Sequence, residues 1–596
     1  MILSPPTILI VSLNNRGSTL SSGDGNVFNP VWNKPVQEGD QALDPLGMNR
    51  VTDRLLNDLL MGITTVTPRA RYYSFYTWVV YNIGKRRTIE NFSQFRSEFY
   101  DLERAFMLAC VAHEQDTNAR NRNHNAISGS EKGHRVWKES GSSISMDFPY
   151  FGHKLGGYGQ YYQGSIAKLG LTMVPEDAAF EQPTELGLKI AEAFGKVIEH
   201  TWFMRDISGK KKVMKEALLK FGSGACLCRL RDADADDRNV LTKLFFGTLS
   251  GTNSSPTTIH RRETLALILF CSDFAASRGF KLSDQHFLDM CYFGQTCGAG
   301  RAHNFVIPKA LAETASMWKV FRAHDYLAYS CEVILSCFLE FLSEKPHIGG
   351  TLDDFLAEVA SKELVGRLRE LTKASVPNKT ATEIQMREIL NGITVSLGLG
   401  EFGGREVEAS KEFDAKVRVS SSFSEFQVME MLEEVVQAGE FNREEVYSPV
   451  CALLISIYIR FFSQHATASK LWRWMIKHTG GDMSPARFVN DFQVRMKAAR
   501  FSLADFMERF TKEYVVEQAK QVYLEKSASI YSKPRSWFHV EGMFFKPDRE
   551  YWARHRNTRF DSATTILEDL GLVKIGGGAI ELSEDGKQLL NKLGVS

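Results

Sequence analysis

The stretch from Asn557 to Leu590 places the tightest limits on how this chain can fold. Its first part carries apolar residues at helical spacing, namely Phe560, Ala563, Leu567 and Leu570. Gly571 stands where a helix commonly ends in a left-handed residue. An apolar run, three glycines and a second apolar run then predict a β-hairpin, and Ser583 can cap a closing helix. The segment therefore predicts the order helix, hairpin, helix.

An earlier stretch repeats this pattern. Leu169-Gly170-Leu171 corresponds to Leu570-Gly571-Leu572. The Thr-Glu-Leu-Gly run at 184–187 corresponds to the Ser-Glu-Asp-Gly run at 583–586. Because a hairpin loop absorbs small differences in length, we expect a β-hairpin between Gly170 and Thr184 as well as one between Gly571 and Ser583.

Helix, hairpin and helix in this order resemble the end of a winged-helix domain. The resemblance implies a small α+β module whose fold serves contacts with DNA in some proteins and contacts with protein in others. We therefore expect a winged-helix-like module at the C-terminus and a second one near residues 125–200.

The length of the chain, 596 residues, exceeds what one hydrophobic core usually serves. Long amphipathic stretches joined by short loops predict a mainly α, multi-domain protein with a helical body. A strand at Thr7–Leu13 is expected ahead of the first helices. The predicted divisions are an N-terminal part at 1–124, a winged-helix-like module at 125–200, a helical body at 201–397, a second helical region at 398–500 and a C-terminal winged-helix-like module at 501–596.

Cysteine usage indicates a cytoplasmic protein, and the charge balance indicates no overall electrostatic attraction to nucleic acid or membrane. The formal net charge is +1, so any basic binding surface must be local. The nine cysteines are odd in number and several lie in apolar contexts, which is typical of reduced thiols. Two apolar runs, Tyr326–Leu342 and Val450–Ile459, fall short of the ~20 residues that span a bilayer. We therefore expect no contact with a membrane.

Basic and small polar residues near the C-terminus are candidates for contact with duplex DNA. The candidates are Arg554, Arg556, Arg559, Ser562 and Thr565. In winged-helix proteins that bind DNA, the helix before the hairpin enters the major groove and basic residues near its start hold phosphates. Acidic residues on the same helix would repel phosphate, and the arginines could equally pair with acids elsewhere in the protein.

Weaker candidates lie near the N-terminus. Arg69 and Arg71 precede a run of aromatic residues, and cations among aromatics can hold phosphates and stack bases. The aromatics occupy nearly every face of the predicted helix, which favours a central core helix instead. Arg120 and Arg122 lie in a long polar stretch, Asp116–Met146, that is predicted to be a surface loop.

One pattern favours an enzyme. Asp414 and Lys416 lie in an alternating stretch, Phe413–Val419, that is predicted to be a strand, which would place both on one face. Metal-dependent nucleases use such a pair with an upstream acid, here Glu401, Glu406 or Glu408, to hold Mg²⁺ and orient water. A solvated strand face with alternating charges also explains the pattern, and we favour this interpretation because the three-residue pattern occurs by chance in most long proteins.

Other catalytic and metal signatures are missing from the sequence. There is no GxxxxGK[ST] loop and no HExxH motif. Cys226-x-Cys228 and the pair Cys291 and Cys297 lack a partner at the usual spacing, so no metal site is predicted. The sequence therefore favours a protein that is not an enzyme and needs no cofactor.

Three segments together resemble large bacterial proteins encoded near phage-defence genes. They are Thr64–Tyr72, the helix start at 184–187 and the stretch Arg559–Gly571 with its hairpin. The resemblance implies a context, antiviral defence, rather than an activity. We expect a non-enzymatic DNA-associated or scaffolding component of a defence complex, with duplex DNA or other subunits as partners. The alternatives are a nuclease subunit that uses Asp414 and Lys416, and a protein-binding adaptor.

Overall fold

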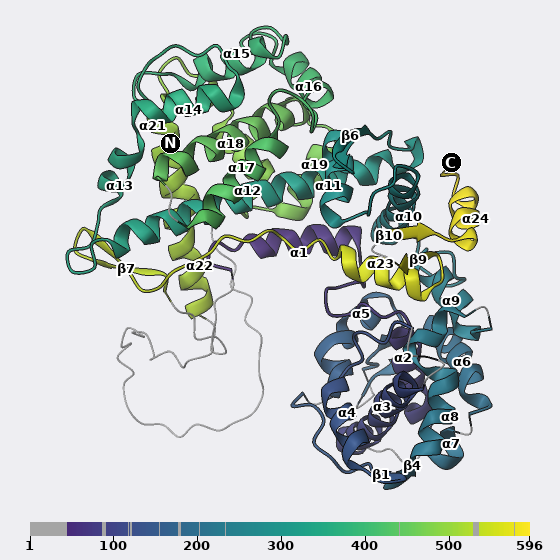
Figure 1. Ribbon diagram of the computed structural model, residues 1–596. Coiled ribbons are helices and arrows are strands. Elements are labelled where there is room, and N and C mark those ends of the chain that lie inside the picture. Colours follow the sequence, from purple (N-terminus) through teal and green to yellow (C-terminus); the bar gives the residue numbers. More distant parts are fainter. Residues whose placement is uncertain are drawn as a thin grey trace.

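The computed structural model describes residues 44–85, 91–116, 119, 122–153, 155–176, 180–201, 203–232, 234–439, 442–528, 536–576 and 579–595. The predicted strand Thr7–Leu13 and Arg120 lie outside these residues. Over the described part the protein is mainly helical and multi-domain, as the sequence predicts, and its sheets are two-stranded. Figure 1 shows two helical lobes with α1 (Met48–Leu59) and α23 (Phe560–Asp569) between them.

The first lobe, at the lower right of Figure 1, is built around α2 (Arg71–Gly84). This helix is buried on nearly every face, because apolar and aromatic residues go almost all the way round it, so the predicted core helix is confirmed. The helix α4 (Ser130–Glu139) lies within Asp116–Met146, so the surface loop predicted for that stretch is wrong over these residues. The other elements of the lobe are α3 (Phe92–Gln115), α4 (Ser130–Glu139), β1 (Ser143–Ser145), η1 (Tyr158–Tyr162), α5 (Gln163–Lys168), β2 (Thr172–Met173), β3 (Gln182–Pro183), α6 (Glu185–Glu199), α7 (Phe203–Asp206), β4 (Lys212–Met214), α8 (Lys215–Ala225), η2 (Leu227–Arg231) and α9 (Asp236–Phe245).

The second lobe packs around α12 (Ala312–Ser343) and α18 (Arg443–Ala466), which contact each other. By length and composition, Lys309–Ser343 and α18 are each able to cross a membrane, and most of either segment is buried inside the protein. The other elements are α10 (Pro256–Ser277), α11 (Asp284–Phe293), β5 (Gln295–Gly298), β6 (Arg301–Asn304), η3 (Lys309–Leu311), α13 (Leu352–Val359), α14 (Lys362–Thr372), α15 (Met386–Ser396), α16 (Glu406–Lys416), α17 (Glu425–Ala438), α19 (Lys470–Thr479), α20 (Pro485–Phe492), η4 (Arg495–Lys497), α21 (Leu503–Phe510), η5 (Thr511–Val516) and α22 (Glu517–Ser527).

The C-terminal part of the chain runs back from the second lobe to the first. The strands β7 (Phe538–Glu541) and β8 (Phe544–Pro547) form a hairpin beside α12. Residues 550–558 form neither helix nor strand and pass along α1 to reach α23, as the yellow trace in Figure 1 shows. The strands β9 (Val573–Gly576) and β10 (Ala579–Leu582) and the helix α24 (Glu584–Lys592) follow and pack against α10.

Both hairpins that the sequence predicts are present. The strands β2 and β3 pair between Gly170 and Thr184, and β9 and β10 pair between Gly571 and Ser583. The two units also agree in backbone detail, because Gly170 and Gly571 are left-handed, with φ of 72° and 69°. The second unit has a single helix, α23, directly before its hairpin, since the residues that lead into α23 are irregular.

The residues that start the closing helices form the same contacts in both units. The hydroxyl of Thr184 donates to the carbonyl of the left-handed glycine at 2.6 Å and accepts the amide of Gly187 at 3.0 Å. The hydroxyl of Ser583 forms the corresponding bonds at 2.7 and 3.1 Å, the second one with Gly586. The sequence correspondence between the two stretches therefore reflects a shared local structure.

The predicted strand at Phe413–Val419 is wrong. Residues Glu406–Lys416 form the helix α16, which packs on α18. Phe413 and Val417 lie one helical turn apart and are both buried, so the apolar spacing that resembles a strand here also suits a helix.

We predict that Gly187→Ala and Gly586→Ala each lower the free energy of unfolding by about 2–4 kcal/mol. A Cβ atom would lie 2.0 Å from the Leu171 carbonyl oxygen in the first case and 2.3 Å from that of Leu572 in the second. Denaturant unfolding monitored by hydrogen exchange in each hairpin measures the loss.

Gly164 on α5 supplies the matched control for these glycine variants. A Cβ at Gly164 meets no atom within 4 Å, so Gly164→Ala should be neutral or should stabilise by about 0.5–1 kcal/mol. Equal effects of Gly164→Ala and Gly586→Ala would show that the close approach has no role.

Candidate functional site

The two arginines before and at the start of the aromatic helix are fully buried. Nε and an NH2 group of Arg69 donate to the two carboxylate oxygens of Asp569 on α23, each at 2.9 Å. Arg71 pairs in the same way with Asp237 on α9, at 3.1 and 2.9 Å. Burial alone would lower the pKa of Arg69, but Asp569 raises it, so the guanidinium stays charged. Both side chains are occupied by carboxylates of the same chain.

Of the three arginines that the sequence proposes for phosphate contact, two are buried and one is exposed. Arg556 donates to both carboxylate oxygens of the buried Glu332 at 2.7 Å, and Arg559 pairs with Asp53 at 3.1 Å. Both arginine side chains are buried. The side chain of Arg554 is exposed, while its amide donates to Glu332. A phosphate group would have to displace acidic partners from two of these three arginines.

The helix α23 itself lies inside the protein. Ser562 is 4% exposed, and the hydroxyl of Thr565 donates to the carbonyl of Asp561 at 2.7 Å. The acidic side chains of Glu568 and Asp569 are buried as well, because Asn123, Arg231 and Arg69 reach them from the first lobe. Ser562 is therefore covered in this structure, whereas Thr565 is half-buried and Asp561, one turn before it, is exposed.

The remaining sequence candidates lie far from one another or have their own partners. Arg122 pairs with Asp232 at 2.9 Å. Asp414 accepts from Lys319 at 2.8 Å and from Arg460 at 2.7 Å. Residues two positions apart on a helix point in roughly opposite directions, so Lys416 lies away from Asp414 and reaches the carbonyls of residues 397–398 instead. Glu408 is exposed. Asp414, Lys416 and Glu408 therefore do not form the metal-binding arrangement that a nuclease site needs.

A histidine on the irregular segment 550–558 links that segment to the second lobe. His555 contacts Asp325 at 2.9 Å and Glu433 at 2.8 Å, and its ring stacks on Tyr329. Burial alone would lower the pKa of His555, but the two carboxylates overcome it and raise the pKa to about 9. Arg322 also contacts Asp325, which limits the shift.

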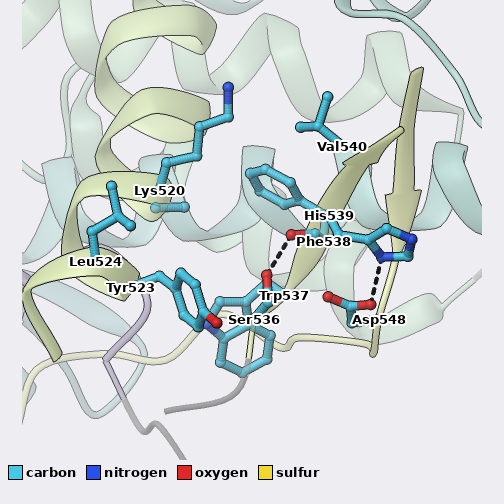
Figure 2. Close-up of a pocket in the computed structure, with 10 residues that line it drawn as sticks. Lys520, Tyr523, Leu524, Ser536, Trp537, Phe538, His539, Val540 and Asp548 are labelled. Atoms are coloured by element: carbon cyan, nitrogen blue, oxygen red, sulfur yellow. Dashed lines mark hydrogen bonds and ion pairs between the residues drawn. The ribbon is translucent and has the colours of Figure 1, made fainter. Parts of the chain in front are cut away.

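A groove opens between α22 and the hairpin β7–β8. Its volume is about 490 Å³. Figure 2 shows Lys520, Tyr523 and Leu524 on α22 facing the Ser536–Val540 segment across it. Two of its apolar lining residues stay exposed, with Leu524 at 65% and Val540 at 48%, and Met543 in the turn of the hairpin is 77% exposed. Exposed apolar clusters of this kind mark sites of protein contact.

The hairpin has one outer edge that is paired and one that borders the groove. Phe545 on β8 exchanges backbone hydrogen bonds with Gly350, at 2.9 and 3.0 Å. Val540 is opposite Phe545 in the register, so its N–H and C=O point away from β8 on the other side. Sequence reasoning missed this hairpin, although a turn glycine, Gly542, stands between two runs rich in aromatic and β-branched residues.

Four potential metal ligands meet in the first lobe. We call His113, His124, Cys226 and Cys228 the His/Cys cluster; all four are buried, and their ligand atoms lie within 4.8 Å of one another. His113 lies in the last turn of α3, His124 follows in the loop, and the two cysteines lie at the start of η2. The sequence analysis predicted no metal site, because the histidines lie about a hundred residues before the cysteines and only the tertiary fold unites them.

Comparison with models of protein families, with curated proteins and with solved structures finds no match to this chain.

We predict that Asp569→Ala destabilises the protein by about 3–5 kcal/mol, because it leaves the buried charge of Arg69 without a partner. Replacing both residues at once, with Arg69→Met and Asp569→Leu, should recover much of this loss, since no buried charge remains. Urea unfolding of the three proteins measures the differences.

Asp585→Ala is the matched control for the buried pair. It removes the partner of Arg238, but Asp585 is 58% exposed, so the expected loss is at most ~1 kcal/mol. A loss for Asp569→Ala as small as that of the control would contradict the assignment of Arg69 and Asp569 as a joint between the lobe and α23.

We predict a pH-dependent contribution of His555 to stability. Its pKa is about 9 in the folded protein and ~6.5 in an unfolded chain, so the contribution is complete below pH ~6.5 and is lost as the pH rises through about 9. The stability difference between the wild type and His555→Gln should shrink by about 2–3 kcal/mol between pH 6 and pH 10. A stability difference that is independent of pH would rule out the charged form of His555.

Proposed function

We propose that this protein is a non-enzymatic, cytoplasmic scaffolding component of a bacterial antiviral assembly. In this proposal it holds a partner protein by an extended segment that adds to the edge of β7. The observation that carries the proposal is the groove between α22 and β7, where a strand edge lies beside exposed apolar side chains. The defence context comes from the resemblance of Thr64–Tyr72, 184–187 and Arg559–Gly571 to proteins encoded near phage-defence genes.

The chemistry of the groove suits an extended peptide. The outward N–H and C=O of Val540 can bond a strand laid along β7, as in β-strand addition. Alternate side chains of that strand would then face α22, where Tyr523 and Leu524 offer apolar surface. Lys520 lines the groove as well, and its ammonium donates to Glu517 on the same helix at 3.0 Å. The opposite edge of the hairpin is already paired with Gly350, so one side is left for addition.

The same proposal assigns the two helix–hairpin–helix units to protein contact within the molecule. We infer that they are winged-helix-like modules whose helices serve packing, because α23 is covered by the first lobe and its acids accept from Arg69 and Asn123. The observations that disfavour duplex DNA are the pairing of Arg556 and Arg559 with acids and the burial of Ser562.

The proposal is tested with the proteins encoded beside this one. We expect Leu524→Asp and Val540→Pro each to weaken co-purification and measured affinity by at least about tenfold. Val540→Pro removes an N–H that points away from β8, so the hairpin itself should persist. Loss of phage protection should accompany the loss of affinity.

Two control variants separate docking from general damage. Val540→Thr keeps the N–H and the β-branched shape and should bind like the wild type. Val306→Asp changes an apolar residue that is 82% exposed and lies outside the groove, so it should also be neutral. Unchanged partner affinity and protection in Leu524→Asp and Val540→Pro would overturn the proposal. Salt-dependent binding of duplex DNA by the wild type would favour the DNA-associated alternative.

A further inference from the structure

The spacing of the His/Cys cluster matches a tetrahedral metal site. Cys226 Sγ and Cys228 Sγ are 3.6 Å apart, and Cys228 Sγ lies 3.4 Å from His113 Nδ1. His124 Nε2 lies 3.4 Å from His113 Nδ1. A tetrahedral Zn²⁺ with bonds of about 2.3 Å to sulfur and 2.0–2.1 Å to nitrogen separates its ligands by about 3.8 Å for two sulfurs, 3.5 Å for sulfur and nitrogen and 3.4 Å for two nitrogens.

We propose that the His/Cys cluster binds one Zn²⁺ ion in a closed, structural site. Two thiolates and two imidazoles form a borderline-soft donor set that suits zinc over magnesium or calcium. All four side chains are buried, so the ion would have no open position for a substrate. The site goes beyond the scaffolding role and concerns how the first lobe is held together.

Neighbouring groups orient the ligands. His124 Nδ1 lies 3.0 Å from the carbonyl of Arg122, which fixes the Nδ1–H tautomer and leaves Nε2 free to bind a metal. An NH1 group of Arg71 donates to the carbonyl of Cys226 at 2.8 Å and holds the backbone at the first cysteine. The pairing of Arg71 with Asp237 fixes that arginine in turn. Contacts that hold a ligand in its orientation in this way are typical of metal sites that are preformed by the fold.

Burial keeps the two thiols neutral as long as no cation is bound. Burial raises the pKa of Cys226 well above its usual value, and a hydrogen bond with Cys226 together with burial raises that of Cys228 to about 11. Coordination would replace the two thiol protons by the ion and release them to solvent. The negative charge of two thiolates would then be compensated by Zn²⁺ inside the lobe.

A bound ion would join parts of the chain that meet at α23. The loop that carries His124 also supplies Asn123, which donates to Glu568, and Asn125, whose carbonyl accepts from Arg69. Zinc would fasten this loop to η2, which contacts α23 too. The ion would thereby support the docking of the C-terminal unit on the first lobe.

The test begins with metal content. The full chain, purified without chelator from zinc-supplemented cells, should contain one Zn²⁺ per molecule, as measured by inductively coupled plasma mass spectrometry. Cys228→Ser and His124→Ala should lose it. Cys271→Ala is the matched control, because Cys271 is a buried thiol on α10 that does not belong to the cluster, so this variant should keep the ion.

A second measurement covers variants that fail to fold. Titration of the metal-free wild-type chain with Co²⁺ should give the visible bands of tetrahedral cobalt and the ultraviolet band of cobalt bound to thiolate, saturating at one ion. Added Zn²⁺ should abolish both. A wild-type chain that carries no stoichiometric zinc and shows no thiolate band with Co²⁺ would overturn the proposal and identify the cluster as a hydrogen-bonded group of neutral side chains.

Discussion

The buried ion pair between Arg69 and Asp569 joins residues that are 500 positions apart in the sequence. A charge in the interior must be paired, so α23 has to dock in one orientation for Arg69 to be satisfied. The contact of the Ala70 amide with the same carboxylate adds to this requirement. The rest of the architecture follows from it, because the chain must return from the second lobe along α1 to place α23 against α2.

Acidic residues on the helices beside the returning segment 550–559 also fix its position. Arg556 pairs with Glu332, and Arg559 pairs with Asp53. His555 pairs with both Asp325 and Glu433. Asp325 and Glu332 lie on α12 and Glu433 lies on α17, both in the second lobe, whereas Asp53 lies on α1 between the lobes. Residues that look like a phosphate-binding set along the sequence are thus distributed over internal joints. Removing one partner leaves a buried charge, which makes these joints specific as well as strong.

The His/Cys cluster and the groove occupy opposite ends of this framework. The cluster lies under α23 in the first lobe, next to the loop that contacts Glu568. The groove lies on the second lobe, where the return path begins with β7 and β8. In the proposed function, the end with the cluster is held within the molecule, the end with the groove is available to a partner, and the extended segment 550–558 connects the two.

Local patterns in the sequence determined the helical class, the aromatic core helix and both hairpins, because turn glycines, caps and apolar spacing act within a few residues. They did not determine the role of a charged side chain. In the sequence, Arg69 and Arg556 are candidates for phosphate contact. In the structure, acids from distant helices pair with both of them in the interior. The strand predicted around Asp414 gave way to a helix because α18 buries Phe413 and Val417 on one face. The His/Cys cluster likewise exists only where α3 packs on α8, since long-range packing decides which buried groups meet.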